Sequence, residues 1–208
     1  MQDRFDALPD AHLIDRSTLT ELGFSPFFQR QLPADAAGSE PARVLAVARS
    51  GLDLAGEGWV AHVPLGGRWF EGPAESRPTV GDWVLVDRAG PRIEAVLERS
   101  SVFRRRGAGS EEVQLIAANV EVVLLVSACN RDFNVARLER YLVVALEAGA
   151  TPVVVLTKAD LAEDPAQFVA QATRLSPGLP VEAVDARDPA TLSGIQAWCT
   201  PGTTLALL

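Results

Sequence analysis

Residues 152–160 read Pro-Val-Val-Val-Leu-Thr-Lys-Ala-Asp, a short apolar run that ends in a polar segment. A continuous run rich in β-branched residues is typical of a strand that is buried on both faces of a parallel sheet. In open parallel sheets, ligands bind beyond the carboxyl ends of the strands. The stretch therefore predicts an α/β fold with a binding loop at residues 157–160.

Lys158 is the only lysine in the chain, which otherwise carries eighteen arginines. An apolar strand followed by x-Lys-x-Asp is the guanine-specificity motif of GTP-binding proteins, in which the aspartate accepts two N–H bonds from the base. The lysine stem lies flat on the base, where a planar guanidinium is not equivalent. A solvated Lys158/Asp160 pair in a strand-to-helix loop is the alternative that four residues leave open.

Strand and helix alternate around this stretch. Asn134 is suited to cap the start of one helix, Gly149 to end it, and Asp164-Pro165 to open the next. Three alternations of this kind predict a parallel sheet. The expected strands are 120–126, 152–156, 181–184 and a fourth that begins at 203; the expected helices are 134–149, 164–172 and 189–198.

In the amino-terminal half, apolar residues recur at every second position, which is the pattern of β-strands. Gly/Pro-rich turns separate five short runs, which is typical of a small closed barrel of the oligonucleotide-binding (OB) type, although an SH3-like barrel has nearly the same pattern. The runs are 43–48, 58–63, 68–70, 81–87 and 92–97. Trp59, Trp69 and Trp83 are either core residues or platforms on which bases stack.

These patterns predict four segments. They are an N-terminal extension at 1–37, an OB-type barrel at 38–102, an arginine-rich linker at 103–118 and part of an α/β domain at 119–208. Leu22, Phe24, Phe27 and Phe28 are expected to tether the extension to the barrel by apolar packing.

Composition limits the class of protein. With 208 residues and 48% apolar content, the chain can form well-packed cores. No apolar run approaches the roughly 20 residues of a membrane span, and the acidic N-terminus does not resemble a signal peptide, so a cytoplasmic location without a membrane partner is expected. Cys129 and Cys199 lie far apart without CxxC spacing, which indicates neither a disulfide framework nor a zinc site.

The net charge of −8 argues against indiscriminate nucleic-acid binding. A local exception is the cluster formed by Arg99 and the run Arg104, Arg105 and Arg106, which Gly107 and Gly109 are expected to keep flexible and exposed. Contact with RNA phosphates is predicted for this run. The alternative is a solvated linker whose charge is partly offset by nearby glutamates.

Four separated motifs resemble one family. They are Gly-Asp-Trp-Val at 81–84, Ala-Asn-Val at 118–120, Asn-Arg-Asp-Phe-Asn at 130–134 and Arg-Leu-Glu-Arg-Tyr-Leu at 137–142. From about residue 38 onward, the chain resembles the circularly permuted GTPases that depend on the small ribosomal subunit, the RsgA/YjeQ family. The resemblance implies an OB barrel before a GTPase domain, binding to the 30S subunit through 16S rRNA late in its maturation, and GTP hydrolysis there.

The resemblance also assigns roles to residues. Asp160 would read guanine, Lys158 would stack on the base, and Thr157 stands where the motif most often has Asn. The second guanine loop usually reads Ser-Ala and is here Asp185-Ala186, whose Ala186 N–H would reach the guanine oxygen. Both departures lead us to expect weaker guanine binding without a change of base.

The phosphate-binding loop GxxxxGK[ST] does not occur in the sequence. Family order places that loop after the strand that begins at Thr203. We therefore expect an N-terminal fragment without the phosphate loop, the switch regions or the C-terminal zinc domain. GTP or GDP with Mg²⁺ would serve the full-length protein, zinc would belong only to the missing domain, and this chain would hold no catalytic residue or metal ligand and would not hydrolyse GTP.

The edge strand at 203–208 is predicted to promote self-association. A naturally short, non-catalytic OB-containing module that binds RNA or the ribosome is the alternative function. A dinucleotide oxidoreductase is excluded because no GxGxxG lies between a strand and a helix.

Overall fold

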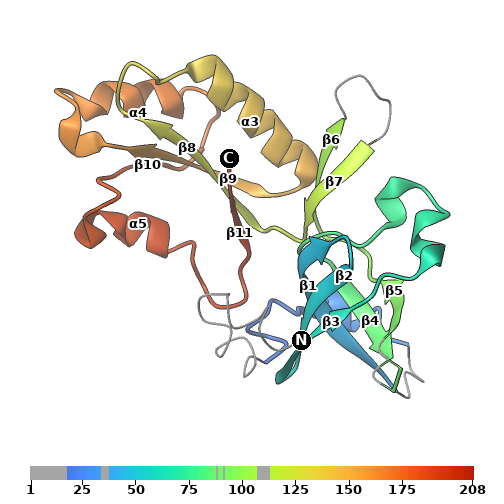
Figure 1. Cartoon of the computed structure of the whole chain (residues 1–208). Helices are drawn as coiled ribbons and strands as arrows, with labels where there is room; N and C mark the ends of the chain where they lie inside the picture. The colour runs from blue at the N-terminus through green and yellow to red at the C-terminus, as the bar shows by residue number, and fades with distance from the viewer. Residues whose placement is uncertain (1–17, 34–37, 88, 91, 107–112) are drawn as a thin grey trace. The chain divides into compact units, whose positions relative to one another are not determined.

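The computed structural model describes residues 18–33, 38–87, 89–90, 92–106 and 113–208 (Figure 1). The chain divides into two compact units, Met1–Asn119 and Val120–Leu208. No helix in the described ranges is long and apolar enough to cross a membrane.

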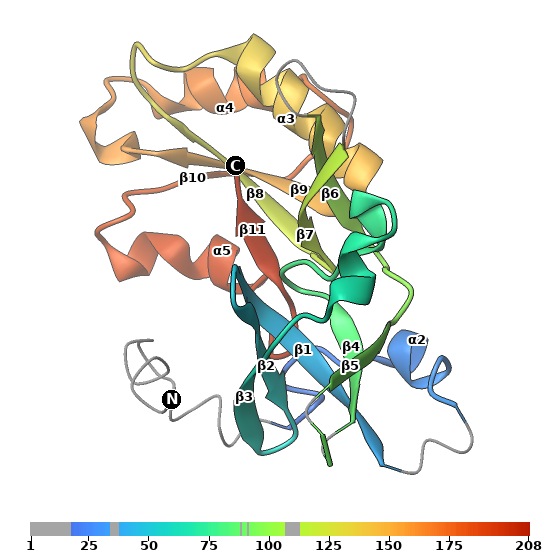
Figure 2. The same cartoon turned by 45° about the vertical axis from the view of Figure 1, so that its right-hand side comes forward.

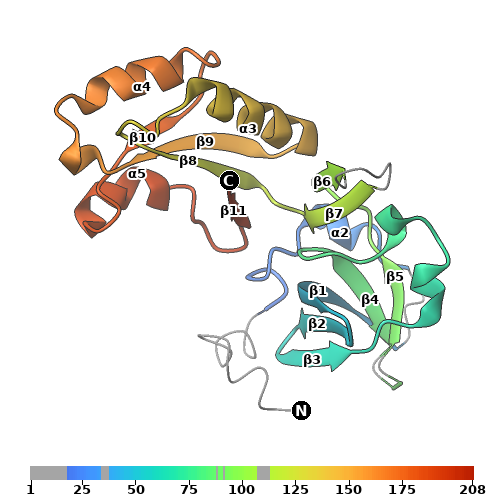
Figure 3. The same ribbon diagram turned by 45° about the horizontal axis from the view of Figure 1, so that its top comes forward.

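Unit 1 is built on an antiparallel sheet of five strands in the order β3-β2-β1-β4-β5 (Figure 3). Its central strand β1 is ten residues long and has a register shift between Val44 and Ala46 where it pairs with β2. Such an irregularity bends a strand locally, and β1 pairs antiparallel with both of its neighbours, β2 and β4. The strands are β1 (Ser39–Ala48), β2 (Gly51–Gly56), β3 (Trp59–Val63), β4 (Trp83–Asp87) and β5 (Arg92–Val96).

One strand assignment made from the sequence is wrong, and one strand was not predicted. Residues 68–70 belong to the 3₁₀ helix η2 (Gly67–Phe70), which is followed by a second, η3 (Ala74–Ser76). The strand that sequence reasoning missed is β2, whose six residues are all buried. Asp53 in its middle argues against a buried strand, but its carboxylate lies 2.6 Å from Nδ1 of His62, the residue opposite it on β3.

The apolar tether is confirmed. The short helix α2 (Pro26–Gln29) and the turn before it pack on β4 and β5, where the rings of Phe24 and Phe28 lie with their centroids 4.8 and 5.9 Å from that of Trp83. Trp83 is fully buried and is therefore a core residue, not a stacking platform. Trp59 and Trp69 are partly buried against the other core of the sheet.

Several residues of the family-like motifs hold unit 1 together. The buried carboxylate of Asp82 accepts two hydrogen bonds from Arg99, at 2.7 and 2.8 Å, and one from the Thr79 N–H. Asn119 has a left-handed backbone (φ 56°), and its side chain donates to the Gly81 carbonyl at 3.0 Å. Arg99 is therefore committed to the fold and is not part of an exposed RNA-binding cluster.

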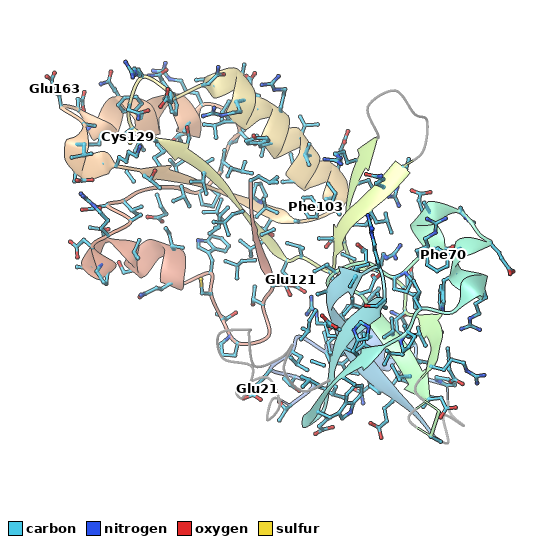
Figure 4. The ribbon with its side chains drawn as sticks, viewed as in Figure 1. Glu21, Phe70, Phe103, Glu121, Cys129 and Glu163 are labelled. Atoms are coloured by element: carbon cyan, nitrogen blue, oxygen red, sulfur yellow. The ribbon has the colours of Figure 1, made fainter. Side chains whose placement is uncertain are left out.

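The arginine run lies in a strand where the sequence suggested a flexible linker. β6 (Val102–Arg106) pairs antiparallel with β7 (Val113–Ala118), whose residues alternate between half-buried and exposed. Phe103 of β6 is buried, whereas Arg104 and Arg105 after it are exposed (Figure 4). Gly107 and Gly109, which were expected to keep the arginines flexible, lie outside the described residues.

Unit 2 is the predicted parallel sheet, with strand order β10-β9-β8-β11. Helices α3 and α4 cover one face, and the short α5 lies on the other (Figures 1 and 2). The strands are β8 (Val122–Ala128), β9 (Thr151–Thr157), β10 (Val181–Ala183) and β11 (Leu205–Leu207); the helices are α3 (Val135–Ala148), α4 (Pro165–Thr173) and α5 (Ser193–Gln196), with the 3₁₀ turn η5 (Pro189–Leu192) before α5.

Alternate residues of the central strands fill the two cores. Val122, Leu124, Val153 and Val155 form one buried cluster, on which Leu192, Ile195 and Trp198 pack from the side of α5. The boundaries of α3 agree with the sequence signals, whereas residues 189–198, expected to form one helix, form the 3₁₀ turn η5 and the four-residue α5. Asn134 caps α3 by accepting from the Arg137 N–H, and Gly149 ends it with a left-handed backbone (φ 83°).

Candidate functional site

The end of β9 carries an unusual backbone conformation at Lys158. This residue is left-handed (φ 59°, ψ 32°), a state that costs a non-glycine residue roughly 1–2 kcal/mol. The turn is held on both sides, because the Leu161 N–H donates to the Lys158 carbonyl at 3.2 Å and the Ala159 N–H donates to the carbonyl of Val184, the residue after β10, at 3.1 Å. Backbone strain that the surroundings enforce is concentrated at functional sites.

A second tight loop follows β10. The side chain of Asp185 accepts from the Arg187 N–H at 3.0 Å, and its carbonyl accepts from the Asp188 N–H at 2.9 Å. The Thr191 hydroxyl donates to the same carbonyl at 2.8 Å. The Ala186 N–H has no hydrogen-bond partner within the described part of the chain. This loop therefore presents a free backbone donor in a fixed position.

A hollow of about 290 Å³ lies between the two loops, close to the size range of small-ligand sites. The structure brings all five residues predicted for guanine binding to this hollow. Its lining consists of Thr157, Lys158, Asp160, Leu161, Asp185, Ala186 and Arg187. Leu161 and Arg187 were not predicted. Leu161 is 71% exposed, so it offers apolar surface beside the hollow.

Thr157 braces the sheet beside this hollow. Its hydroxyl donates to the Ser127 carbonyl at 3.2 Å, and its own carbonyl accepts from the Cys129 N–H at 2.8 Å. Cys129 lies where β8 ends (Figure 4), and burial raises the pKa of its thiol. The Thr157 side chain is thus used to join the ends of β8 and β9.

Arg187 joins the two loops. Its guanidinium lies 2.7 Å from Oδ2 of Asp160 and 3.1 Å from Oδ1 of Asp185. These contacts lower the pKa of the Asp185 carboxyl below its ordinary value, first through the side-chain hydrogen bond from Arg187, and they raise the pKa of Arg187. Arg187 could have been identified from the sequence, because it lies two residues after Asp185 and its side chain can reach that carboxylate.

The groups that remain unpaired fit the edge and face of a guanine base. Oδ1 of Asp160 and the ammonium of Lys158 have no hydrogen-bond or ion-pair partner within the described ranges. A carboxylate can accept the two N–H groups on one guanine edge, and the Ala186 N–H can donate to the ring carbonyl. The residues at this site thus fit a guanine base.

The segment 130–134 supports the sheet end through local hydrogen bonds. Asn130 Oδ1 accepts from the Asp132 N–H at 2.9 Å, and Arg137 donates to the Asp132 carbonyl at 3.0 Å. Phe133 packs edge-on against Phe168 of α4, with ring centroids 5.2 Å apart. This family-like motif fixes the loop between β8 and α3.

Arg104 and Arg105 of β6 do not share one face of the strand. Arg104 and Arg105 are exposed neighbours on a strand, so their side chains point to opposite faces. Arg104 lies 3.4 Å from Glu75, and Arg105 donates to Gln114 at 3.3 Å. Arg106 is the last residue of the same strand.

Residues 96–208 match the family described as RsgA GTPase. The chain is 44% identical over 193 residues to small ribosomal subunit biogenesis GTPase RsgA 2 of Vibrio vulnificus, covering 92% of this chain and 53% of that protein. It is 41% identical over 204 residues to RsgA of Mesorhizobium japonicum, covering 97% of this chain and 57% of that protein. The chain thus spans about half the length of the curated relatives it matches.

Two solved structures share the fold. The crystal structure of YjeQ from Thermotoga maritima superposes with a TM-score of 0.63 at 20% identity, covering 81% of this chain and 59% of that one. YloQ, described as a circularly permuted GTPase, gives a TM-score of 0.60 at 18% identity, covering 85% of this chain and 62% of that one. The match over residues 96–208, which is more than half of the chain, shows that the chain belongs to the RsgA GTPase family.

Proposed function

We propose that this chain is the guanine-reading part of a GTPase that acts in biogenesis of the small ribosomal subunit. The observation that carries this proposal is the convergence of Asp160 and Ala186 on one hollow, each with an unpaired group of the polarity that guanine requires. The relatives from Vibrio and Mesorhizobium are named as GTPases of this process.

Each residue has a distinct role in the proposed complex. The Asp160 carboxylate accepts from the ring N–H and the exocyclic amine of guanine. The Ala186 N–H donates to the ring carbonyl, and the stem of Lys158 lies on the base. Thr157 keeps the ends of β8 and β9 in register, and Asp185 shapes the loop that presents Ala186.

GTP with Mg²⁺ is proposed as the nucleotide of the whole protein. When bound, the metal ion would neutralise charge on the phosphates during their transfer to water. The GxxxxGK[ST] loop that would hold these phosphates does not occur in the 208-residue sequence. We therefore propose that the 208-residue chain alone binds guanine weakly and does not hydrolyse GTP.

Unit 1 is proposed to be an OB-type module that contacts 16S rRNA of the 30S subunit. The exposed side chains of Arg104 and Arg105 support this role, because arginines that contact phosphates contribute affinity without sequence preference. The same side chains also favour a second candidate, a non-catalytic RNA- or ribosome-binding module that needs no nucleotide.

Titration with nucleoside monophosphates separates the two candidates. With the ¹⁵N-labelled chain and millimolar GMP, we expect NMR shift changes at the amides of Lys158, Asp160 and Ala186, and much smaller changes with AMP. A site built to satisfy particular donors rejects analogues that leave its polar groups unpaired. Equal shifts with both nucleotides, or none with either, would overturn the guanine assignment and favour the nucleotide-independent module.

A further inference from the structure

Two acidic side chains meet at the proposed guanine site. Asp160 follows β9 and Asp185 follows β10, and both line the same hollow. Neighbouring carboxylates repel each other when both are ionised. Without a cation between them, this repulsion would leave the Asp160 side chain without one preferred orientation. Arg187 prevents this because it lies between them: Nη2 contacts Oδ2 of Asp160 at 2.7 Å, and Nε contacts Oδ1 of Asp185 at 3.1 Å.

We propose that Arg187 is a positioning residue for guanine recognition, which bridges the two loops and orients the Asp160 carboxylate toward the base. This inference rests on the proposed function of the site. It adds a determinant of base discrimination that lies outside the Thr-Lys-x-Asp segment and the Asp-Ala pair.

The contact with Arg187 leaves enough hydrogen-bond acceptor positions on Asp160 for the base. Each carboxylate oxygen has two acceptor positions, and Arg187 uses one on Oδ2 of Asp160. Oδ1 of Asp160 has no hydrogen-bond partner among the described residues. The carboxylate can therefore accept two N–H groups from guanine while it keeps the contact with Arg187.

Arg187 is itself held in place by Asp185. The backbone N–H of Arg187 donates to Oδ1 of Asp185 at 3.0 Å, and its guanidinium contacts both oxygens of the same carboxylate, at 3.1 and 3.3 Å. A guanidinium is planar and presents its donors as a fork, so it can span two carboxylates in a way that a lysine ammonium cannot.

The bridge is exposed to solvent, and this exposure determines whether its loss should affect folding stability or nucleotide binding. The side chain of Arg187 is 73% exposed, whereas those of Asp160 and Asp185 are 27% and 21% exposed. Ion pairs on the surface contribute little to folding because water and salt screen them. The effect of Arg187 should therefore be found in base discrimination and not in stability.

The test compares GMP with inosine monophosphate. Inosine lacks the exocyclic amine from which Asp160 would accept a hydrogen bond. Binding to Arg187→Ala and Arg187→Lys is measured by NMR titration, with Arg174→Ala as the control because Arg174 is an exposed arginine at the end of α4. We expect Arg187→Ala to weaken GMP binding about tenfold, the effect of one charge-assisted contact, and to reduce the preference for GMP over inosine monophosphate. Arg187→Lys should bind GMP more tightly than Arg187→Ala but less tightly than the wild type.

A double variant separates positioning from simple loss of positive charge. Asp185→Asn keeps an oxygen that can accept from the Arg187 N–H, but it removes the repulsion with Asp160. In this background, Arg187→Ala should cost much less GMP affinity than in the wild type, so the two substitutions should be non-additive.

The outcomes distinguish failure of the bridge from failure of the site. A wild-type chain that prefers GMP, together with an Arg187→Ala variant that binds GMP equally well or more tightly, overturns the bridge and leaves the guanine site in place. A wild-type chain that responds equally to GMP and AMP, or to neither, overturns the guanine site and the bridge together. Additive losses in the double variant also overturn the bridge.

Discussion

The hydroxyl of Thr157 donates a hydrogen bond of 3.2 Å to the carbonyl of Ser127, thirty residues earlier in the chain. This bond ties the end of β9 to the end of β8, directly beside the hollow that Lys158 and Asp160 line. Thr157, which stands where the guanine motif most often has Asn, thus uses its side chain to join two strands of the sheet.

Replacing Thr157 with valine should test this role. The substitution keeps the branched shape of the side chain and removes the hydroxyl bond to the Ser127 carbonyl, so we expect the free energy of unfolding to fall by about 1 kcal/mol. Urea denaturation measures the change. Thr151→Val, the same substitution at an exposed position of the same strand, is the control and should have little effect. Equal losses in the two variants would contradict a specific role for the Thr157 hydroxyl.

Asp160→Asn should change which base is preferred. The amide can donate where the carboxylate only accepts, so xanthosine monophosphate, which has a second carbonyl in place of the guanine amine, should bind better than GMP. Competition titrations with the two nucleotides, followed at the amides of Lys158 and Ala186, measure the preference. A variant that still favours GMP would show that Asp160 does not read the base.

The pH dependence of the bridge follows from the lowered pKa of Asp185. Because the folded-state pKa is depressed, the stabilisation from this carboxylate is complete above its ordinary value of 3.8 and is lost as the pH falls through the folded-state pKa. Arg187→Ala should raise the pKa of Asp185 toward that ordinary value. Carboxyl ¹³C shifts recorded between about pH 2 and pH 6 test this, and an unchanged midpoint in the variant would show that Arg187 is not the cause.

The arginines of β6 should differ in their contribution to RNA binding. Replacing Arg104, Arg105 and Arg106 together with alanine should weaken binding to 16S rRNA and flatten its salt dependence by about one unit of logarithmic slope for each arginine that pairs with a phosphate. Because Arg104 and Arg105 point to opposite faces of the strand, the single variants should show unequal changes of slope. Filter binding between about 50 and 200 mM salt measures the slopes. An unchanged slope in the triple variant would leave β6 with a purely structural role.

Self-association is expected at the edge of the parallel sheet. β11 is an edge strand that pairs with β8, and its Leu207 is 69% exposed. Exposed strand edges with apolar side chains pair with other chains, whereas a lysine on such an edge opposes pairing. We expect sedimentation velocity to show concentration-dependent association that Leu207→Lys reduces. A wild-type chain that stays monomeric over a wide range of concentration would remove this expectation.

The parallel sheet was predictable because its signals are local. The run at 152–156 is continuous and apolar, and Asn134 and Gly149 mark both ends of α3, so periodicity and capping agree. β2 was missed because Asp53 is acceptable in a buried strand only when His62 lies opposite it, and that pairing depends on the register of two strands. Local sequence contains no information of this kind.

The same limit applies to the site. Lys158 and Asp160 were identified because a loop after a buried strand is visible in the sequence, whereas the bridge from Arg187 to Asp160 joins residues from two different strand ends. Arg99 was misassigned for a related reason. Its neighbours suggested a basic surface, but its partner, the buried Asp82, lies 17 residues away.

The pairing of β11 with β8 also affects how unit 2 folds during synthesis. β8, α3 and β9 follow one another directly, so they can associate as soon as they leave the ribosome. β11 reaches the sheet much later, since the Thr204 N–H donates to Glu121, 83 residues earlier. Until then, the β8 edge that β11 will occupy stays unpaired and open to other chains. Slow translation between residues 157 and 205 would prolong this exposure.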